Sequence, residues 1–216
     1  MKYPNFFEEK NLWKKGFKAV AGLDEAGRGP LAGPVVAAAV CFSRNFSVRG
    51  LKILRDIKDS KKLNERQREN FYKILTTHSD IKWGVGVVSE KIIDKINILE
   101  ATKLAMNRAV VQLGIVPDFL LLDGNFKVDF YCLPAGRQVR QKSVVKGDTK
   151  VFSCCAAGII AKVTRDRLMQ KYHKKYPEYN FSKNKGYPTR AHFACLQTLG
   201  PCKIHRKSFY PVSNFK

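Results

Sequence analysis

Residues 19–42 read AVAGLDEAGRGPLAGPVVAAAVCF, and this stretch decides the fold. The apolar runs at residues 19–23 and 35–42 are typical of two buried strands. The first run ends in two adjacent carboxylates, Asp24 and Glu25, and residues 27–30 then form a turn rich in glycine. The stretch therefore predicts two neighbouring strands with an acidic pair and a tight turn between them.

The acidic pair is the first candidate for chemistry. Carboxylates at the mouth of a buried strand are costly unless a cation pairs with them. A divalent metal fits, because hard cations prefer carboxylate oxygen. Gly27 and Gly29 would let the backbone approach a ligand closely. The alternative is a hairpin whose polar turn holds Asp24 and Glu25 without further function.

Length and charge narrow the class of protein. A chain of 216 residues can bury one sizeable core, or one domain with a small appendage. Forty Lys and Arg against 18 Asp and Glu give a net charge of +22, which indicates an anionic partner, with nucleic acid first and a membrane surface as the rival. No apolar stretch approaches the ~20 residues of a spanning helix, and residues 1–18 lack the apolar core of a signal peptide. We therefore expect a cytoplasmic protein with no membrane partner.

The six cysteines give two further expectations. Cys41, Cys154 and Cys155 lie in apolar patterns, so we expect buried, reduced thiols. The second set combines two histidines with two cysteines, which are zinc ligands by type but have an unusual spacing: His192, Cys195, Cys202 and His205. Structural zinc at this set is left as an open alternative.

The periodicity of the chain predicts alternating strands and helices. We expect a helix at 65–77 after the N-cap Asn64, a strand at 81–88, one or two helices before residue 114, a strand at 119–122, and helices at 151–176 and 189–199. The long helix at 151–176 should be buried in its first half and reach solvent in its charged second half. We predict a mixed α/β sheet flanked by helices, with a catalytic domain at 1–176 and a small helical extension at 177–216.

Further carboxylates stand in settings similar to the first pair. Asp24, Glu25, Asp123 and Asp148 each follow an apolar, strand-like run, and such strand ends can converge at one edge of an α/β sheet. Four carboxylates there would hold two divalent ions about 4 Å apart, one activating water and the other stabilising the leaving oxygen in phosphodiester hydrolysis. Lys and Arg around them would bind phosphates. The alternative for each isolated Asp is a turn or cap residue.

Motifs along nearly the whole chain carry a family resemblance. They are DEAGRGPLAGPV at 24–35, DSKKL at 59–63, GVG at 84–86, DGN at 123–125, KGD at 146–148, AKVTRDR at 161–167, KGY at 185–187 and IHRKSF at 204–209. Together and in this order they resemble ribonuclease HII. Asp-Gly or Lys-Gly-Asp alone would mean little.

The resemblance implies a ribonuclease H-like fold with a C-terminal helical extension. It implies a monomeric endonuclease that hydrolyses the RNA strand of RNA/DNA hybrids and incises single ribonucleotides embedded in duplex DNA, leaving 3′-hydroxyl and 5′-phosphate ends with Mg²⁺ or Mn²⁺ as cofactor. The family's catalytic metal acids map onto Asp24, Glu25, Asp123 and Asp148. Its substrate-binding residues map onto Gly27, Arg28, Gly29, Lys61, Lys146 and Tyr187, with Tyr187 as the junction reader.

The chain departs from the family pattern in two segments. Residues 130–140 look like an insertion, which we expect to be a surface loop, and residues 152–155 read FSCC where the family usually shows serine and alanine.

The competing functions are a non-catalytic nucleic-acid-binding protein, a junction resolvase and ribonuclease HIII. The four acids argue against a pure binder, since carboxylates repel phosphates. The sequence does not say whether a sliding clamp binds.

Overall fold

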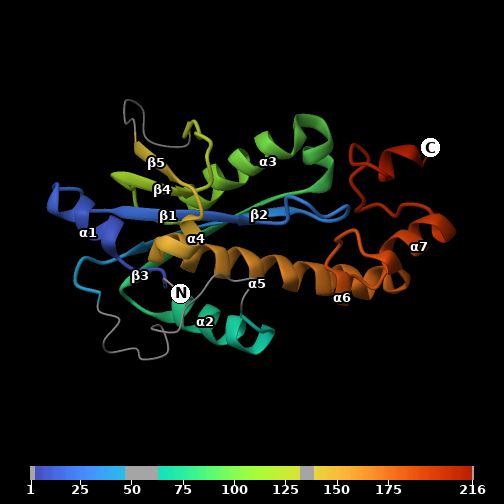
Figure 1. Ribbon diagram of the computed structural model, residues 1–216, viewed down its shortest axis with the longest axis horizontal. Coiled ribbons are helices and arrows are strands. Elements are labelled where there is room, and N and C mark those ends of the chain that lie inside the picture. The colour runs from blue at the N-terminus through green and yellow to red at the C-terminus, as the bar shows by residue number, and fades with distance from the viewer. Residues whose placement is uncertain (1–2, 47–62, 132–138, 216) are drawn as a thin grey trace.

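The computed structural model describes residues 3–46, 63–131 and 139–215 (Figure 1). Its sheet has five strands in the order β3-β2-β1-β4-β5. The strands are β1 (Val20–Ala26), β2 (Val35–Phe42), β3 (Ile81–Val88), β4 (Phe119–Asp123) and β5 (Arg140–Val144). The β1–β2 and β2–β3 pairs are antiparallel, and the β1–β4 and β4–β5 pairs are parallel. The predicted mixed α/β sheet is therefore confirmed.

Helices cover both faces of the sheet (Figure 1). Helix α3 (Glu90–Gln112) packs on one face, and α2 (Glu65–Thr77) and α5 (Phe152–Lys175) pack on the other. Alternate residues of β2 enter the two cores, with Val36 and Ala38 on the α5 side and Val35 and Ala37 on the α3 side. This explains why β2 is continuously apolar, because a strand buried on both faces needs no polar side.

The C-terminal segment packs around the far end of α5. It contains the short helices η4 (Pro177–Tyr179) and α6 (Phe181–Asn184), then α7 (Arg190–Leu199) and η5 (Val212–Asn214). Its apolar core includes Phe181 and Leu196 from the segment itself, Met169 from α5, and Leu31 and Ala32 from the loop between β1 and β2. The Leu31 and Ala32 part of that loop is thus enclosed between the sheet and the C-terminal segment. Division at residue 176 into two domains stays a prediction.

The structure adds elements that the sequence pattern does not predict. They are α1 (Phe7–Lys14), β5 and the single turn α4 (Gly147–Lys150). The expected surface loop at 130–140 needs correction at its ends, because Phe130 and Val139 pack against the α3-side core and Arg140 begins β5. Residues 132–138 lie outside the described residues.

Two smaller expectations are also answered. The five cysteines within the described ranges are free, and Cys41, Cys154 and Cys155 are buried, as predicted. Over the same ranges, the helices are all too short or too polar to cross a lipid bilayer.

Candidate active site

Three aspartates meet at one edge of the sheet. Asp24 lies near the end of β1, Asp123 ends the parallel neighbour β4, and Asp148 lies on α4, directly after β5. One carboxylate oxygen from each lies within 4.8 Å of the other two. Since β1 and β4 run parallel, their carboxyl ends reach the same edge, and the short β5–α4 connection brings in the third acid.

The Asp24 carboxylate is held against helix α5. Its Oδ1 accepts a 2.6 Å hydrogen bond from the Glu25 amide. On the other side, a Cβ built at Gly158 would overlap Asp24 Oδ2, so the carboxylate occupies the space that a side chain at position 158 would need. Asp24 is therefore buried and fixed in direction by the backbone of two elements.

The other two aspartates are positioned by the KGD turn. Lys146 has a left-handed backbone (φ 59°) that turns the chain from β5 into α4. The next amide, that of Gly147, donates a 2.6 Å hydrogen bond to Asp123 Oδ1. Asp148 follows and is buried. The turn thus orients Asp123 and delivers Asp148 to the same place, while the Lys146 side chain is exposed.

The charges of this cluster repel one another. Burial raises the pKa of Asp24 well above its usual 3.8, and the nearby carboxylates of Glu25, Asp123 and Asp148 raise it further. A buried group of like charges is stable only if a cation or protons neutralise it. Oxygen donors at this spacing fit a hard divalent cation such as Mg²⁺ or Mn²⁺.

Glu25 lies beside this cluster rather than in it. Adjacent strand residues point to opposite faces, so Asp24 and Glu25 diverge. Glu25 Oε1 accepts a 3.2 Å hydrogen bond from Arg28 Nη1 in an ion pair across the turn. The structure therefore brings together three of the four predicted acids, and the role of Glu25 as a metal ligand stays a prediction.

A cavity of about 500 Å³ adjoins the acids and collects the predicted substrate-binding residues. It is lined by Glu25, Ala26, Gly27, Arg28, Gly29, Lys162 and Tyr187. Tyr187 is 41% exposed, so its ring can meet a ligand. Of the remaining predicted residues, Lys146 lies at the acid cluster instead, and Lys61 lies outside the described residues.

Lys162 is a candidate site residue that the sequence reasoning did not select. It projects from α5 into the cavity lining and forms a 2.7 Å ion pair with Asp166 one turn later. Burial lowers its pKa, and the Asp166 charge opposes that shift. Its place in the AKVTRDR motif at 161–167 is the signal that could have found it, although the charge pattern there predicts a solvent-facing helix surface.

The alternative zinc set does not assemble. His192 Nε2 and His205 Nε2 are hydrogen-bonded to each other at 3.0 Å. Each Nδ1 is also engaged, with the Tyr187 carbonyl at 2.9 Å for His192 and the Cys202 amide at 2.9 Å for His205. Cys195 Sγ donates to the Glu178 carbonyl. The histidine nitrogens are therefore occupied within the protein, which is a structural role.

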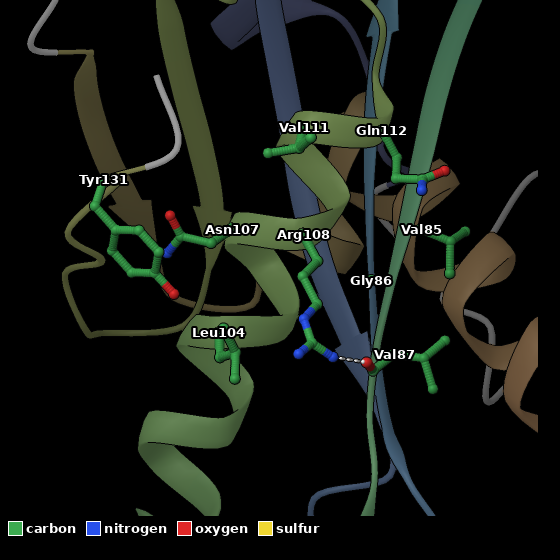
Figure 2. A pocket seen from close by; sticks show the side chains of 9 residues that line it. All are labelled: Val85, Gly86, Val87, Leu104, Asn107, Arg108, Val111, Gln112 and Tyr131. Atoms are coloured by element: carbon green, nitrogen blue, oxygen red, sulfur yellow. Dashed lines mark hydrogen bonds between the residues drawn. The ribbon is translucent and has the colours of Figure 1, made fainter. Parts of the chain in front are cut away.

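A second cavity, of about 530 Å³, lies between α3 and the edge strand β3, as Figure 2 shows. Its lining is mostly apolar and is made by Val85, Gly86, Val87, Leu104, Asn107, Arg108, Val111, Gln112 and Tyr131. The charged group in this lining, Arg108, donates a hydrogen bond to the Val87 carbonyl. Without a carboxylate this cavity offers no group for metal-dependent hydrolysis, so the acid cluster is the candidate active site.

Comparison with known proteins gives a consistent result. Residues 21–212 match the family model of ribonuclease HII. The chain is 50% identical over 208 residues to a ribonuclease HII of Listeria monocytogenes, covering 96% of this chain and 74% of the relative. It is 50% identical over 211 residues to a ribonuclease HII of Chlamydia trachomatis, covering 95% of this chain and 91% of the relative.

Solved structures agree with this match. The ribonuclease H2 of Pyrococcus horikoshii superposes with a TM-score of 0.69 at 28% identity, covering 91% of this chain and 96% of that one. The ribonuclease HII of Archaeoglobus fulgidus, solved in complex with PCNA, also gives 0.69, at 25% identity and coverages of 88% and 95%. Bst ribonuclease HIII, solved with Mn²⁺, shares the fold at 20% identity and a TM-score of 0.65, with coverages of 90% and 68%.

Proposed function

This chain belongs to the ribonuclease HII family, and from that premise we propose how its own residues perform the reaction. The enzyme is a type 2 ribonuclease H, an endonuclease that hydrolyses the RNA strand of RNA/DNA hybrids and incises single ribonucleotides embedded in duplex DNA. The observation that carries our proposal is that a cluster of three aspartates, two of them buried, lies next to a cavity whose lining includes Arg28, Lys162 and Glu25, the neighbour of Asp24.

We propose that Asp24, Asp123 and Asp148, with Glu25 beside them, hold Mg²⁺ or Mn²⁺. Divalent ions bound there would supply the Lewis acid that lowers the pKa of water and neutralises charge on the leaving oxygen. The protein supplies orientation: the Glu25 amide holds Asp24 and the Gly147 amide holds Asp123. Both carboxylates are thus fixed before substrate binds, which reduces the entropy lost on forming the reactive complex.

We propose that the cavity next to the acids binds the nucleic-acid backbone around the scissile bond. Arg28 and Lys162 bring positive charge to its lining, and Lys146 brings another to the acid cluster. Cationic side chains bind phosphates and release counterions. The glycines of the turn let the chain approach a ribose, whose 2′-hydroxyl distinguishes RNA from DNA. Tyr187, at the opposite wall, would contact the neighbouring deoxyribose.

The proposed substrate is tested by one cleavage experiment. A DNA duplex with a single ribonucleotide is incubated with the enzyme, with Mg²⁺, with Mn²⁺ and with EDTA. We expect incision at the ribonucleotide, 5′-phosphate and 3′-hydroxyl ends, and no product in EDTA. Asp24→Asn is the matched control. Binding without cleavage by the wild type in either metal would favour the competing function, a non-catalytic nucleic-acid-binding protein.

The partner on the protein side is a separate question. The Archaeoglobus fulgidus relative was solved with PCNA, a sliding clamp. A pull-down of this chain with a clamp tests whether a partner of that class binds it. The cleavage experiment above needs no such partner, because every residue proposed for the reaction lies on this one chain.

A further inference from the structure

Two arginines lie completely buried beside the glycine-rich turn. Arg165 comes from α5 and Arg206 from the tail after α7, and both side chains are 0% exposed. Among the described residues, neither forms an ion pair with a carboxylate. A buried cation without a counter-ion is costly unless hydrogen bonds satisfy it. Hydrogen bonds from the two guanidinium groups must therefore offset the free-energy cost of burying them.

Arg206 gives all its nitrogens to backbone carbonyls of the turn between β1 and β2. Its Nη2 donates to the Gly27 carbonyl at 2.6 Å, its Nη1 to the Arg28 carbonyl at 2.9 Å, and its Nε to the Gly33 carbonyl at 3.0 Å. The tail is also joined to this turn by a hydrogen bond from the Arg206 amide to the Leu31 carbonyl. One side chain thus ties both ends of the turn to the C-terminal segment.

Arg165 completes the attachment from the other side. Its Nε donates to the Pro34 carbonyl at 3.0 Å and its Nη2 to the Ala32 carbonyl at 3.1 Å. Its Nη1 donates to the Lys185 carbonyl at 2.9 Å, and its Cζ lies 5.8 Å from the centre of the Tyr187 ring. The glycine-rich turn and the segment that carries Tyr187 are therefore bound to the same guanidinium.

The bonds from Arg206 determine where the turn's amides point. Across a trans peptide the C=O and N–H groups face in opposite directions. The carbonyls of Gly27 and Arg28 point inward to Arg206, so the N–H groups of the next residues, Arg28 and Gly29, point away from it. Both residues are exposed and line the cavity beside the acids. A Cβ at Gly27 would overlap Arg165 Nε, so the turn can sit this close only as glycine.

We propose that Arg206 is a positioning residue, supported by Arg165, which aims the Arg28 and Gly29 amides at the ribose and phosphate of the bound strand. Arg206 is buried behind the turn, so it acts through the backbone rather than by touching substrate. This inference deepens the proposed function and rests on it. Substrate discrimination by the turn therefore depends on Arg165 and Arg206, which lie far from the turn in the sequence.

Only arginine can make this arrangement. Its planar fork presents several donors in fixed directions, whereas lysine offers a single ammonium group. Burial, and then the Arg165 charge, lowers the pKa of Arg206 to about 9, so the group is still charged at neutral pH. Replacing it by lysine keeps the charge but satisfies fewer of the three carbonyls.

The test separates aiming of the amides from general attraction of phosphates. Wild type, Arg206→Lys, Arg206→Gln and Arg165→Lys are compared by kcat and KM on a duplex with one ribonucleotide, and by Kd for the all-DNA duplex of the same sequence. Arg44→Lys is the matched control, because Arg44 also donates to two backbone carbonyls, of Trp13 and Phe17, on the surface at the α1 end. The folded fraction of each preparation is measured by circular dichroism.

We expect kcat/KM to fall about tenfold or more in all three site variants, while the Kd for all-DNA duplex changes less than about threefold. Arg44→Lys should match wild type in both quantities. Full activity in Arg206→Lys would overturn the inference, since charge alone would then suffice. A parallel loss of cleavage and DNA binding would also overturn it, since that indicates a purely structural role. If Arg206→Gln does not fold, the inference is judged from Arg206→Lys and Arg165→Lys. Failure of wild type to cut the substrate would instead overturn the proposed function.

Discussion

Asp24 and Gly158 face each other where β1 meets α5, and the carboxylate of one fills the space that a side chain on the other would occupy. The two residues belong to elements far apart in sequence, and they meet because α5 packs against β1. The Asp24 carboxylate, a candidate metal ligand, can take this position only because Gly158 on the neighbouring helix has no side chain.

Gly158→Ala should therefore lower cleavage. The added methyl would displace Asp24 Oδ2 from its place beside Asp123 and Asp148, and a small displacement of a reacting group can cost about 100-fold in rate. We expect kcat to fall at least about tenfold, measured on the duplex with one ribonucleotide. Gly16→Ala is the control, because it strains a positive φ in open space far from the acids. Cleavage by Gly158→Ala equal to that of the control would show that Asp24 can move without consequence.

Asp24→Asn should stabilise the metal-free protein while abolishing cleavage. The pKa of Asp24 is raised in the folded state, so its ionisation opposes folding, and stability falls as pH rises above 3.8 toward the folded-state pKa. Removing that charge should raise the melting temperature in EDTA at pH 7 by roughly 2–4 °C for each kcal/mol gained. Mg²⁺ or Mn²⁺ should stabilise the wild type more than the variant.

A surface acid provides the comparison for this prediction. Glu100 forms an exposed ion pair with Lys103, so Glu100→Gln should change the melting temperature little in either condition. If Asp24→Asn melts below wild type in EDTA, then the repulsion among the aspartates is already relieved without metal. The three-aspartate cluster would then be a hydrogen-bonded, protonated group rather than a cation site.

The bonded histidine pair behind Tyr187 predicts an acid-sensitive fold. The Cys202 amide donates to His205 Nδ1, so His205 carries its proton on Nε2 and donates it to His192. His192 in turn donates from Nδ1 to the Tyr187 carbonyl. This chain of donors needs both rings neutral, because an extra proton would set two N–H groups against each other.

Stability should consequently fall between about pH 6.5 and pH 4. Burial, then the charge of His192, lowers the pKa of His205 to about 4, so the unfolded state binds more protons than the folded state in that window. The free energy of unfolding should drop by up to about 3 kcal/mol as pH decreases through it. Urea unfolding at several pH values measures this slope. His205→Asn should flatten the slope and His78→Asn should not. Equal slopes in wild type and His205→Asn would contradict the prediction.

Most of the fold could be predicted because its strands have clear signals. The runs at 35–42 and 81–88 begin and end where the pattern places them, and Asn64 caps α2 as its sequence position indicates. Strand β5 could not be predicted, because RQKSV has neither alternation nor β-branched enrichment until Val144. Its place depends on tertiary contacts, including the hydrogen bonds of the Gln141 amide group with the backbone of Val128.

The site likewise contains residues that could be predicted from the sequence and residues that could not. The aspartates could be selected because each follows an apolar run, and their convergence follows from strand direction. Arg165 and Arg206 could not, since a charged residue in a basic helix or tail is normally solvated. The expectation that the charged half of the long helix reaches solvent is therefore wrong at Arg165, which is completely buried. Only the tertiary structure shows the carbonyls that repay this burial.

Tyr187 provides the last prediction, which concerns recognition of the RNA-to-DNA step. Its amide donates to the Asn184 carbonyl and its carbonyl accepts from the Thr189 amide and from His192. The residue is 41% exposed, and its ring lies beside Gly29. The ring can lie against a deoxyribose, where an extra hydroxyl would crowd it. Tyr187→Ala should lower cleavage at a single embedded ribonucleotide by more than about tenfold. The melting temperature should change little, because the ring contributes little to the core.

A second variant of Tyr187 identifies which part of its side chain acts. Tyr187→Phe keeps the ring and removes the hydroxyl, so near-normal cleavage by Phe together with loss in Ala would assign the effect to contact of the ring with sugar. Loss in both would assign it to a hydrogen bond from the hydroxyl. Tyr210→Ala, which removes a ring that is 78% exposed, is the control for loss of a surface aromatic. If Tyr187→Ala cuts the junction as well as wild type, the step is read elsewhere, and the turn held by Arg206 becomes the remaining candidate.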